Sequence, residues 1–216
     1  MNRSTLLAGV VAIAWATSGC QSIYYGTMEK LGYEKRDLLV GDVKDARGAQ
    51  DEARKQFASA LEEFTSVLGS PGGDLEAKYK KLDGVLRRSE AKAEAVHSRV
   101  REVERVATAL FREWKAELGQ YSSATLRQSS ETQLRATERR YDDLMIAMKR
   151  ASSRMEPVLK VLRDQVLFLK HNLNAQAIAS IKNEIVRVES DVSALVREME
   201  AAIAEADRFI AAMPQG

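Results

Sequence analysis

The fold is decided by the stretch LEAKYKKLDGVLRRSEAKAEAVHSRVREVERVATALFREWKAELGQY, residues 75–121. Apolar side chains recur in it every three or four residues and form two parallel seams. The first seam is Leu75, Leu82, Ser89, Val96, Val103, Leu110 and Glu117, and the second is Tyr79, Leu86, Ala93, Val100, Ala107, Trp114 and Tyr121. Twelve of the fourteen positions are apolar or aromatic. This heptad pattern predicts a long helix that packs against partners along its whole length.

Three other stretches show the same spacing. The first has Val43, Gln50, Phe57 and Phe64 beside Ala46, Ala53, Ala60 and Val67. The third has Leu134, Tyr141, Met148, Met155, Leu162 and Leu169 beside Thr137, Leu144, Ala151, Val158 and Gln165. The fourth has Ile178, Ile185, Val192, Met199, Ala206 and Met213 beside Ile181, Val188, Leu195, Ala202 and Phe209. We interpret these seams as packing core and not as a cofactor site.

Helix-breaking residues separate the four stretches. They fall at 69–73 (GSPGG), at 119–125, and at 171–174 (HNLN). The predicted helices cover about 34–68, 74–119, 124–171 and 175–212. Asp74 and one of Ser122, Ser123 and Thr125 are expected to cap helices. Connections this short force neighbours to run antiparallel, so the sequence predicts an all-α, elongated, antiparallel four-helix bundle.

Pro157 lies inside the third predicted helix. A proline there removes a backbone donor and clashes with the preceding turn, so a bend near Ser153 is expected. The sequence leaves open whether the bend is static or a hinge.

The overall composition narrows the class of protein. The chain has 216 residues, 33 basic against 31 acidic side chains, a net charge of +2 and 45% hydrophobic residues. The apolar content argues against disorder, and the near-neutral charge argues against nucleic-acid binding. Net charge alternates along the chain: −2 over 29–68 (7 basic, 9 acidic), +2 over 74–118 (11, 9), +4 over 124–171 (10, 6) and −3 over 175–212 (4, 7). Each hairpin therefore joins an acidic helix to a basic one, which favours their pairing.

Residues 1–19 have the features of a signal peptide. Arg3 precedes eleven apolar residues, 6–16, which span only about 16 Å as a helix and are too short to cross a bilayer. Thr17-Ser18-Gly19 then lead into Cys20, the sole cysteine. This arrangement resembles the bacterial lipoprotein processing box, so Cys20 is the expected lipidation site, carrying acyl chains such as palmitate. The alternative is an ordinary secretory signal that leaves a free thiol.

The expected location follows from the same region. By resemblance to the lipoprotein sorting pattern, Gln21 in place of Asp favours the inner leaflet of the outer membrane, with the chain facing the periplasm. Residues 20–33 would then form the anchor and a short tether, and 34–213 the helical bundle. Two or more acyl chains on one residue suffice for stable membrane attachment.

A basic cluster stands out in the third stretch: Arg135, Arg139, Arg140, Lys149, Arg150 and Arg154. Pairing with an acidic neighbouring helix accounts for it. A second interpretation is a face, residues 127–154, that binds an anionic lipid or a cell-wall polymer.

Residues for catalysis or metal binding are not grouped in any recognisable motif. His97 and His171 lack the i, i+4 companion of a zinc helix, and Asp142-Asp143 point in different directions on a helix. Glu117 lies on a seam near a helix end and is expected to reach solvent. We therefore predict no enzyme activity, no metal and no cofactor.

Several stretches carry a family resemblance. They are 21–25 (QSIYY), 28–33 (MEKLGY), 35–37 (KRD), 72–76 (GGDLE), 110–114 (LFREW), 155–159 (MEPVL) and 164–174 (DQVLFLKHNLN). Through them the mature chain resembles an uncharacterised bacterial lipoprotein family, the domain-of-unknown-function family 2959. The resemblance implies a lipidated, coiled-coil-rich envelope protein and assigns no activity.

Together these features predict a structural, scaffold or adaptor role with other envelope proteins as partners. Heptad seams can close within one chain or between chains, so a homo-oligomer is possible. Residues 166–169 (VLFL) are apolar on all sides and are expected to be covered by the other helices or by a partner.

Overall fold

The computed structural model describes residues 20–69, 74–172 and 175–213, and describes side chains outside 20–34, 175–179 and 182–186. Its elements are α1 (Cys20–Gly69), α2 (Leu75–Glu117), the short 3-10 helix η1 (Leu118–Gln120), α3 (Ala124–His171) and α4 (Ala175–Ala212). Within these described ranges there is no strand. The predicted all-α class is confirmed, as are the bounds of the third and fourth helices.

The first helix is longer than the sequence predicted. It begins at Cys20 and not near residue 34, so the segment expected to be a short tether continues as helix into the bundle. Residues 1–19, the predicted signal peptide, lie outside the described part of the chain. The second helix gives way at Leu118 to η1, slightly earlier than predicted.

Two of the predicted helix caps are present. The Asp74 side chain accepts a hydrogen bond from the backbone N–H of Glu76 at 2.9 Å. Of the three candidates before α3, Ser123 is the cap: its Oγ accepts from the Leu126 N–H at 3.3 Å. Both side chains satisfy backbone donors that the first turn of a helix leaves unpaired.

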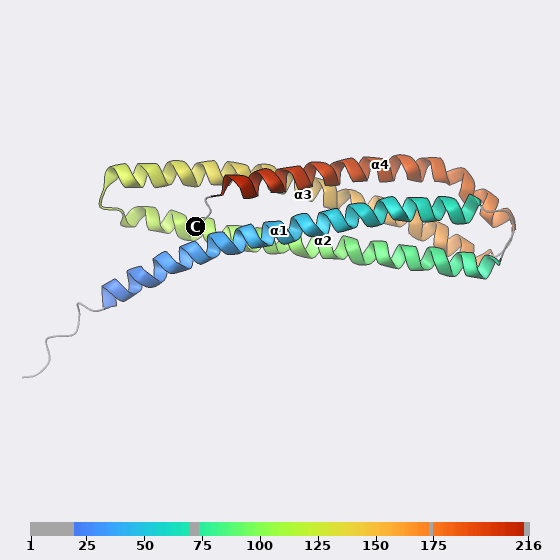
Figure 1. Ribbon diagram of the computed structural model, residues 1–216, viewed down its shortest axis with the longest axis horizontal. Coiled ribbons are helices and arrows are strands. Elements are labelled where there is room, and N and C mark those ends of the chain that lie inside the picture. The colour runs from blue at the N-terminus through green and yellow to red at the C-terminus, as the bar shows by residue number, and fades with distance from the viewer. Residues whose placement is uncertain (1–19, 70–73, 173–174, 214–216) are drawn as a thin grey trace, which may run out of the picture.

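The four helices run along the same long axis of the molecule (Figure 1). α1 lies against α2 and α4, and α3 lies against the same two helices, so the four form a closed ring of neighbours. Among the described residues the backbones of the diagonal pairs, α1 with α3 and α2 with α4, do not approach each other closely. Consecutive helices run antiparallel, as the short connections require. The predicted bundle is confirmed, and one chain closes its own seams.

The predicted seams form the core. All eight positions of the first stretch are buried, and so are ten of the eleven in the third, where Tyr141 is half-buried. Burial weakens toward both ends of α2: Leu75 and Tyr79 are half-buried at one end, Glu117 is half-buried at the other, and Tyr121, just after η1, is 42% exposed. The core includes the polar seam residues Gln50, Ser89, Thr137 and Gln165.

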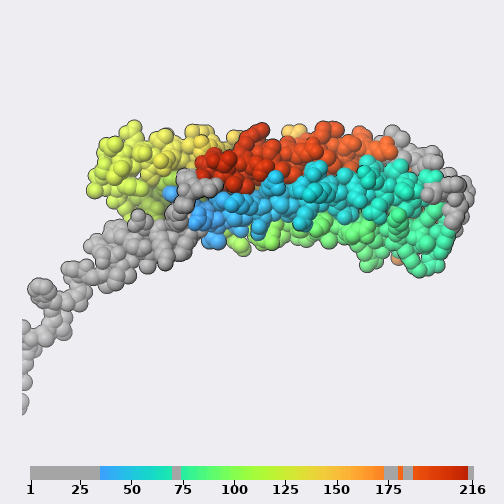
Figure 2. All heavy atoms as spheres, viewed as in Figure 1, coloured from blue at the N-terminus to red at the C-terminus, as the bar shows by residue number. Residues whose placement is uncertain are grey.

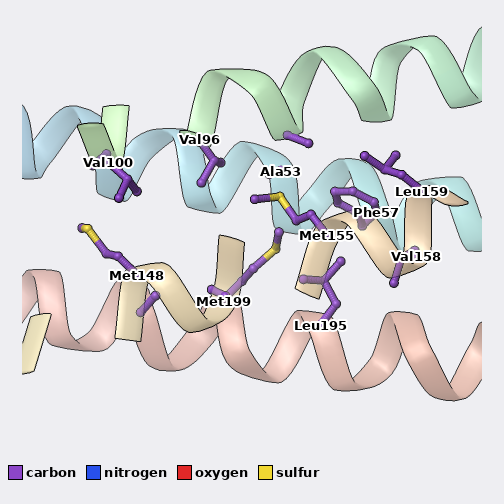
Figure 3. Close-up of a cluster of buried hydrophobic side chains, with 14 of the residues drawn as sticks. Ala53, Phe57, Val96, Val100, Met148, Met155, Val158, Leu159, Leu195 and Met199 are labelled. Carbon is purple, nitrogen blue, oxygen red and sulfur yellow. The ribbon is translucent and has the colours of Figure 1, made fainter. Parts of the chain in front are cut away.

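The middle of the core is built by all four helices (Figure 3). Ala53 and Phe57 come from α1, Val96 and Val100 from α2, Met148, Met155, Val158 and Leu159 from α3, and Leu195 and Met199 from α4. All ten side chains are at most 5% exposed. The small Ala53 beside the large Phe57 lets neighbouring helices interleave side chains of different size.

α3 continues without interruption through Pro157, which lies on its exposed face. One turn earlier the hydroxyls of Ser152 and Ser153 donate to the carbonyls of Lys149 and Arg150, at 3.0 and 2.9 Å. Such bonds to the preceding turn accompany helix bending. The bend expected near Ser153 stays a prediction.

Candidate functional site

Cys20, the predicted lipidation site, is the first residue of α1. It therefore starts a helix that continues into the bundle without a break as far as Gly69. The position on the helix is described, whereas the Cys20 side chain lies outside the described side chains. No described helix is long and apolar enough to cross a membrane.

The bundle end nearest Cys20 is held by an aromatic junction of three helices. The guanidinium carbon of Arg36, on α1, lies 4.5 Å from the centroid of the Trp114 ring on α2. The Trp114 indole N–H donates to the Ser130 hydroxyl on α3 at 2.8 Å. Trp114 is only 7% exposed. One side chain thus joins α1, α2 and α3 in a desolvated setting, where cation–π attraction is strongest.

Charged groups surround this junction. Lys35 pairs with Glu113 across α1 and α2. Glu117 is half-buried, and burial, followed by repulsion from Glu113, raises the pKa of its carboxyl. Glu117, which is expected to reach solvent, therefore does so only in part. Leu118 of η1, which follows directly, is also half-buried.

A pair of aromatic rings lies one helical turn inward. The Phe111 and Tyr141 rings meet edge-to-face, with centroids 5.3 Å apart and planes at 71°. Burial, then the negative charges of Glu104 and Asp142, raises the pKa of the Tyr141 phenol to about 12. The Arg36–Trp114 contact and the Phe111–Tyr141 ring pair make this end a packing site rather than an open pocket.

The basic cluster of α3 is largely neutralised by its neighbours. Arg150 and Arg154 both pair with Glu198 of α4, at 2.8 and 3.5 Å. Lys149 pairs with Glu104 of α2 and Arg135 with Glu131 of its own helix. The prediction that an acidic helix compensates these charges is confirmed for Arg150 and Arg154. Four of the six basic residues in the cluster thus form ion pairs.

Arg139 and Arg140 differ from the other four. Both are exposed, and within the described residues neither forms an ion pair. They lie toward the same bundle end as the aromatic junction, since Glu138 beside them pairs with Lys115 at 2.7 Å. Within the proposed anionic-partner face of residues 127–154, Arg139 and Arg140, together with Arg127, are therefore exposed arginines without an ion pair to a described residue.

An open groove of about 630 Å³ lies between α3 and α4 at the other end of the bundle. Its walls are Pro157, Lys160, Val161, Asp164, Gln165, Phe168, Ser180, Ile181, Arg187 and Asp191. Sequence reasoning missed it, because heptad spacing locates buried seams and carries no signal for an imperfect fit between two helices. The groove mixes apolar walls with charges of both signs at its edge.

The apolar segment 166–169 is only partly covered. Val166 and Leu169 are 4% and 0% exposed, whereas Leu167 and Phe168 are 52% and 42% exposed. Val166 and Leu169 therefore pack into the core, whereas Leu167 and Phe168 are exposed and Phe168 lines the groove. The other helices cover the first two of these residues, and the cover expected from a partner for the other two stays a prediction.

Metal-ligating groups do not converge in the described structure. Among the side chains that the structure describes, no group of three or more His, Cys, Asp or Glu could hold an ion. His97 lies half-buried on α2, and His171 is exposed in the last turn of α3. The two histidines occur on different helices and share no described partner.

The fold defines an elongated helical bundle with a single buried core, a class that serves mechanical, scaffold and binding roles alike. Comparison with known families then narrows the class. The profile of a family described as protein of unknown function (DUF2959) matches residues 24–213, and the chain belongs to this family. No curated protein matches the chain significantly.

Proposed function

We propose that the protein is a lipoprotein, anchored through acylated Cys20 to the periplasmic face of the outer membrane, that works as a scaffold or adaptor. The proposal rests on one observation: the sole cysteine of the chain is the first residue of α1, the helix that continues into the bundle. An acyl group on Cys20 would thus be attached to the folded body through continuous helix.

The chemistry at Cys20 supports membrane attachment. A lone thiol in an oxidising compartment is exposed to oxidation and to unwanted disulfides, and acylation removes that hazard. A single acyl chain binds membranes only marginally, whereas two or three chains on one residue bind stably. Acylated Cys20 would thus be an anchor sufficient in itself.

The body has the properties of a stiff spacer. α1 contains 50 residues, about 75 Å of helix at 1.5 Å per residue. Ion pairs join each pair of neighbouring helices: Glu52–Lys92, Arg47–Asp207, Arg163–Glu90 and Arg150–Glu198. These contacts and the continuous core resist bending, so a partner bound at the far end would be held tens of ångströms from the membrane.

The outer surface offers places where partner proteins could bind. Leu38, Ile146 and Phe168 are large apolar side chains that are 57%, 66% and 42% exposed. Leu38 lies on α1, whereas Ile146 and Phe168 lie on α3 about 20 residues apart, so the three are at different distances from Cys20. An adaptor with several partners would present such separate apolar contacts on its long faces.

The test is crosslinking in intact cells from single photoreactive residues placed at Ile146 or Phe168, with Lys44, exposed on α1, as a control position. The scaffold role predicts discrete protein adducts at one or both apolar positions that survive a high-salt wash. Cys20→Ala should release the protein from the membrane and remove the adducts. Equal adduct patterns at all three positions, or adducts unchanged in Cys20→Ala, would contradict the proposal.

The second candidate function is binding of an anionic lipid or cell-wall polymer. It is favoured by one observation: Arg139 and Arg140, consecutive residues of α3, are both exposed and form no ion pair with a described residue. It predicts salt-sensitive binding to anionic vesicles or cell-wall fragments that Arg139→Glu with Arg140→Glu abolishes. Arg150→Glu is the matched control, because Arg150 is already paired with Glu198 and should matter much less.

A further inference from the structure

The turn between α2 and α3 has an unusual composition. Residues 118–130, LGQYSSATLRQSS, contain no acidic residue and a single charged one, Arg127. We call this segment the hairpin tip. It is bounded by acidic residues on both sides, Glu117 and Glu131, in a chain that is 30% charged overall. The near absence of charge therefore belongs to the turn and its immediate flanks.

The hairpin tip exposes apolar side chains. Leu126, in the first turn of α3, is 59% exposed, and Tyr121, at the end of η1, is 42% exposed. Arg127 beside Leu126 is exposed and pairs with no described carboxylate. A Leu, a Tyr and a free Arg at one exposed turn combine an apolar contact, an amphipathic ring and a cation.

The hairpin tip lies at the same end of the bundle as Cys20. The ion pair between Lys35 and Glu113 fixes the register of α1 against α2. Cys20 is 15 residues before Lys35, about 22 Å of helix, and Tyr121 is 8 residues after Glu113, about 12 Å in the same direction. The two lie within about 10 Å of each other along the axis by this helical rise.

The shape of the molecule leaves the hairpin tip free to touch a surface. Figure 1 shows the ends of α2 and α3 and their turn reaching past the C-terminal end of α4. Figure 2 shows the same part of the hairpin protruding from the body, beyond the atoms of α4. Neither α4 nor another described segment caps it. A modest lean of the rod toward the hairpin tip would close the remaining axial offset from Cys20.

We propose that the hairpin tip is a second membrane contact, which docks on the phospholipid headgroups of the leaflet that holds the acyl chains. The inference rests on the proposed anchor at Cys20 and adds the orientation of the rod. Leu126 enters the interface, the Tyr121 ring lies at headgroup level, and Arg127 pairs with lipid phosphate.

Each of these residues matches the chemistry of the interface. Tyrosine is enriched where headgroups meet hydrocarbon because its ring is apolar and its hydroxyl polar. Arginine near the surface is attracted by anionic lipid, and no carboxylate within the hairpin tip opposes that attraction. The short α2–α3 turn then fixes a second point of the same rigid body, so the membrane sets both the tilt and the rotation of the bundle.

The experiment places a dye at the hairpin tip of the full acylated protein. Ser122→Cys provides the only free thiol, because the sulfur of Cys20 carries lipid; Ser122 is exposed. The protein is bound to vesicles of phosphatidylethanolamine and phosphatidylglycerol that contain a nitroxide-headgroup lipid as quencher. Thr65→Cys, exposed near the other end of α1, is the matched control. Vesicle flotation measures anchoring separately.

The expected result is strong quenching at residue 122, little at residue 65, and loss of quenching to the residue-65 level when Tyr121→Ser and Leu126→Ser are added. Flotation should stay unchanged in that variant. Quenching absent at residue 122 with intact flotation overturns the second contact and leaves the anchor standing. Equal quenching at both positions, which means a rod lying flat, also overturns it. Failure of the acylated protein to float removes the anchor and this inference together.

Discussion

Arg36 stacks on Trp114 with its guanidinium carbon 4.5 Å from the ring centroid, and the Arg36 Nε is buried with no hydrogen-bond partner among the described residues. The cation is thus held mainly by the face of the indole. The contact joins residues 78 positions apart in the chain and fixes the start of the packed part of α1 against α2. It sits between the proposed anchor and the body of the rod.

Arg36→Ala should lower the free energy of unfolding by about 1–2 kcal/mol, the range of a largely desolvated cation–π contact. Lys44→Ala, on an exposed part of the same helix, should change it little. A chain that starts at Cys20 has Trp114 as its only tryptophan, since the other is Trp15. Urea unfolding followed by Trp114 fluorescence therefore measures both variants. Equal stabilities would contradict the role given to this contact.

Phe57→Ala should destabilise the bundle by about 3–5 kcal/mol, because it removes a large ring and leaves a cavity where four helices meet. Phe57 is fully buried. Ile146→Ala removes a similar apolar side chain from a position that is 66% exposed and should cost little. Chemical denaturation of both variants gives the comparison. A small effect for Phe57 would mean that the seams do not close on one another as described.

Gln50→Met should stabilise the bundle by about 1–3 kcal/mol, the cost of an unpaired buried amide. Gln50 is fully buried on α1, and neither atom of its amide has a hydrogen-bond partner in the structure. Gln56→Met is the contrasting change, because Gln56 donates to the buried Ser89 hydroxyl at 3.3 Å and its loss should destabilise. Thermal melts rank the two; a destabilised Gln50→Met chain would show that a partner, such as a buried water, satisfies the amide.

Tyr141 should make stability fall at alkaline pH. Burial raises the pKa of its phenol to about 12, so the folded chain keeps a proton that the unfolded chain loses near pH 10. The contribution of the protonated Tyr141 phenol to the free energy of unfolding is complete below pH of about 10, and it declines as pH rises toward about 12. Tyr141→Phe keeps the edge-to-face contact with Phe111 and removes this decline. Urea midpoints of the two proteins measured across that range should diverge; parallel curves would refute the assignment.

Much of the fold could be predicted because burial in a long bundle follows heptad spacing. Phe57, Val100 and Leu195 were placed in the core by periodicity alone, and all are buried. The breaks were visible as glycine, proline and capping residues, so Ser123 and Asp74 mark real helix starts. Sequence spacing did not predict where α1 begins, because residues 20–33 have no regular seam, yet they continue the helix.

The candidate site was predicted less completely. The sequence predicts that the basic residues of α3 pair with an acidic neighbouring helix, and Glu198 of α4 pairs with two of them, Arg150 and Arg154. Which guanidinium groups stay free depends on the rotation of α3 relative to α2 and α4, and sequence does not give that rotation. The Arg36–Trp114 contact was likewise hidden, since it depends on the register between two helices distant in sequence. The groove beside Phe168 arises from a local misfit that no periodicity encodes.

The proposed lipid anchor is tested most directly by the intact mass of the mature protein purified from its membrane. The expected chain begins at Cys20 and carries the mass of a diacylglyceryl group on sulfur, with or without a further acyl chain on the new amine. A chain that begins elsewhere, or one that begins at Cys20 with an unmodified thiol, would contradict it.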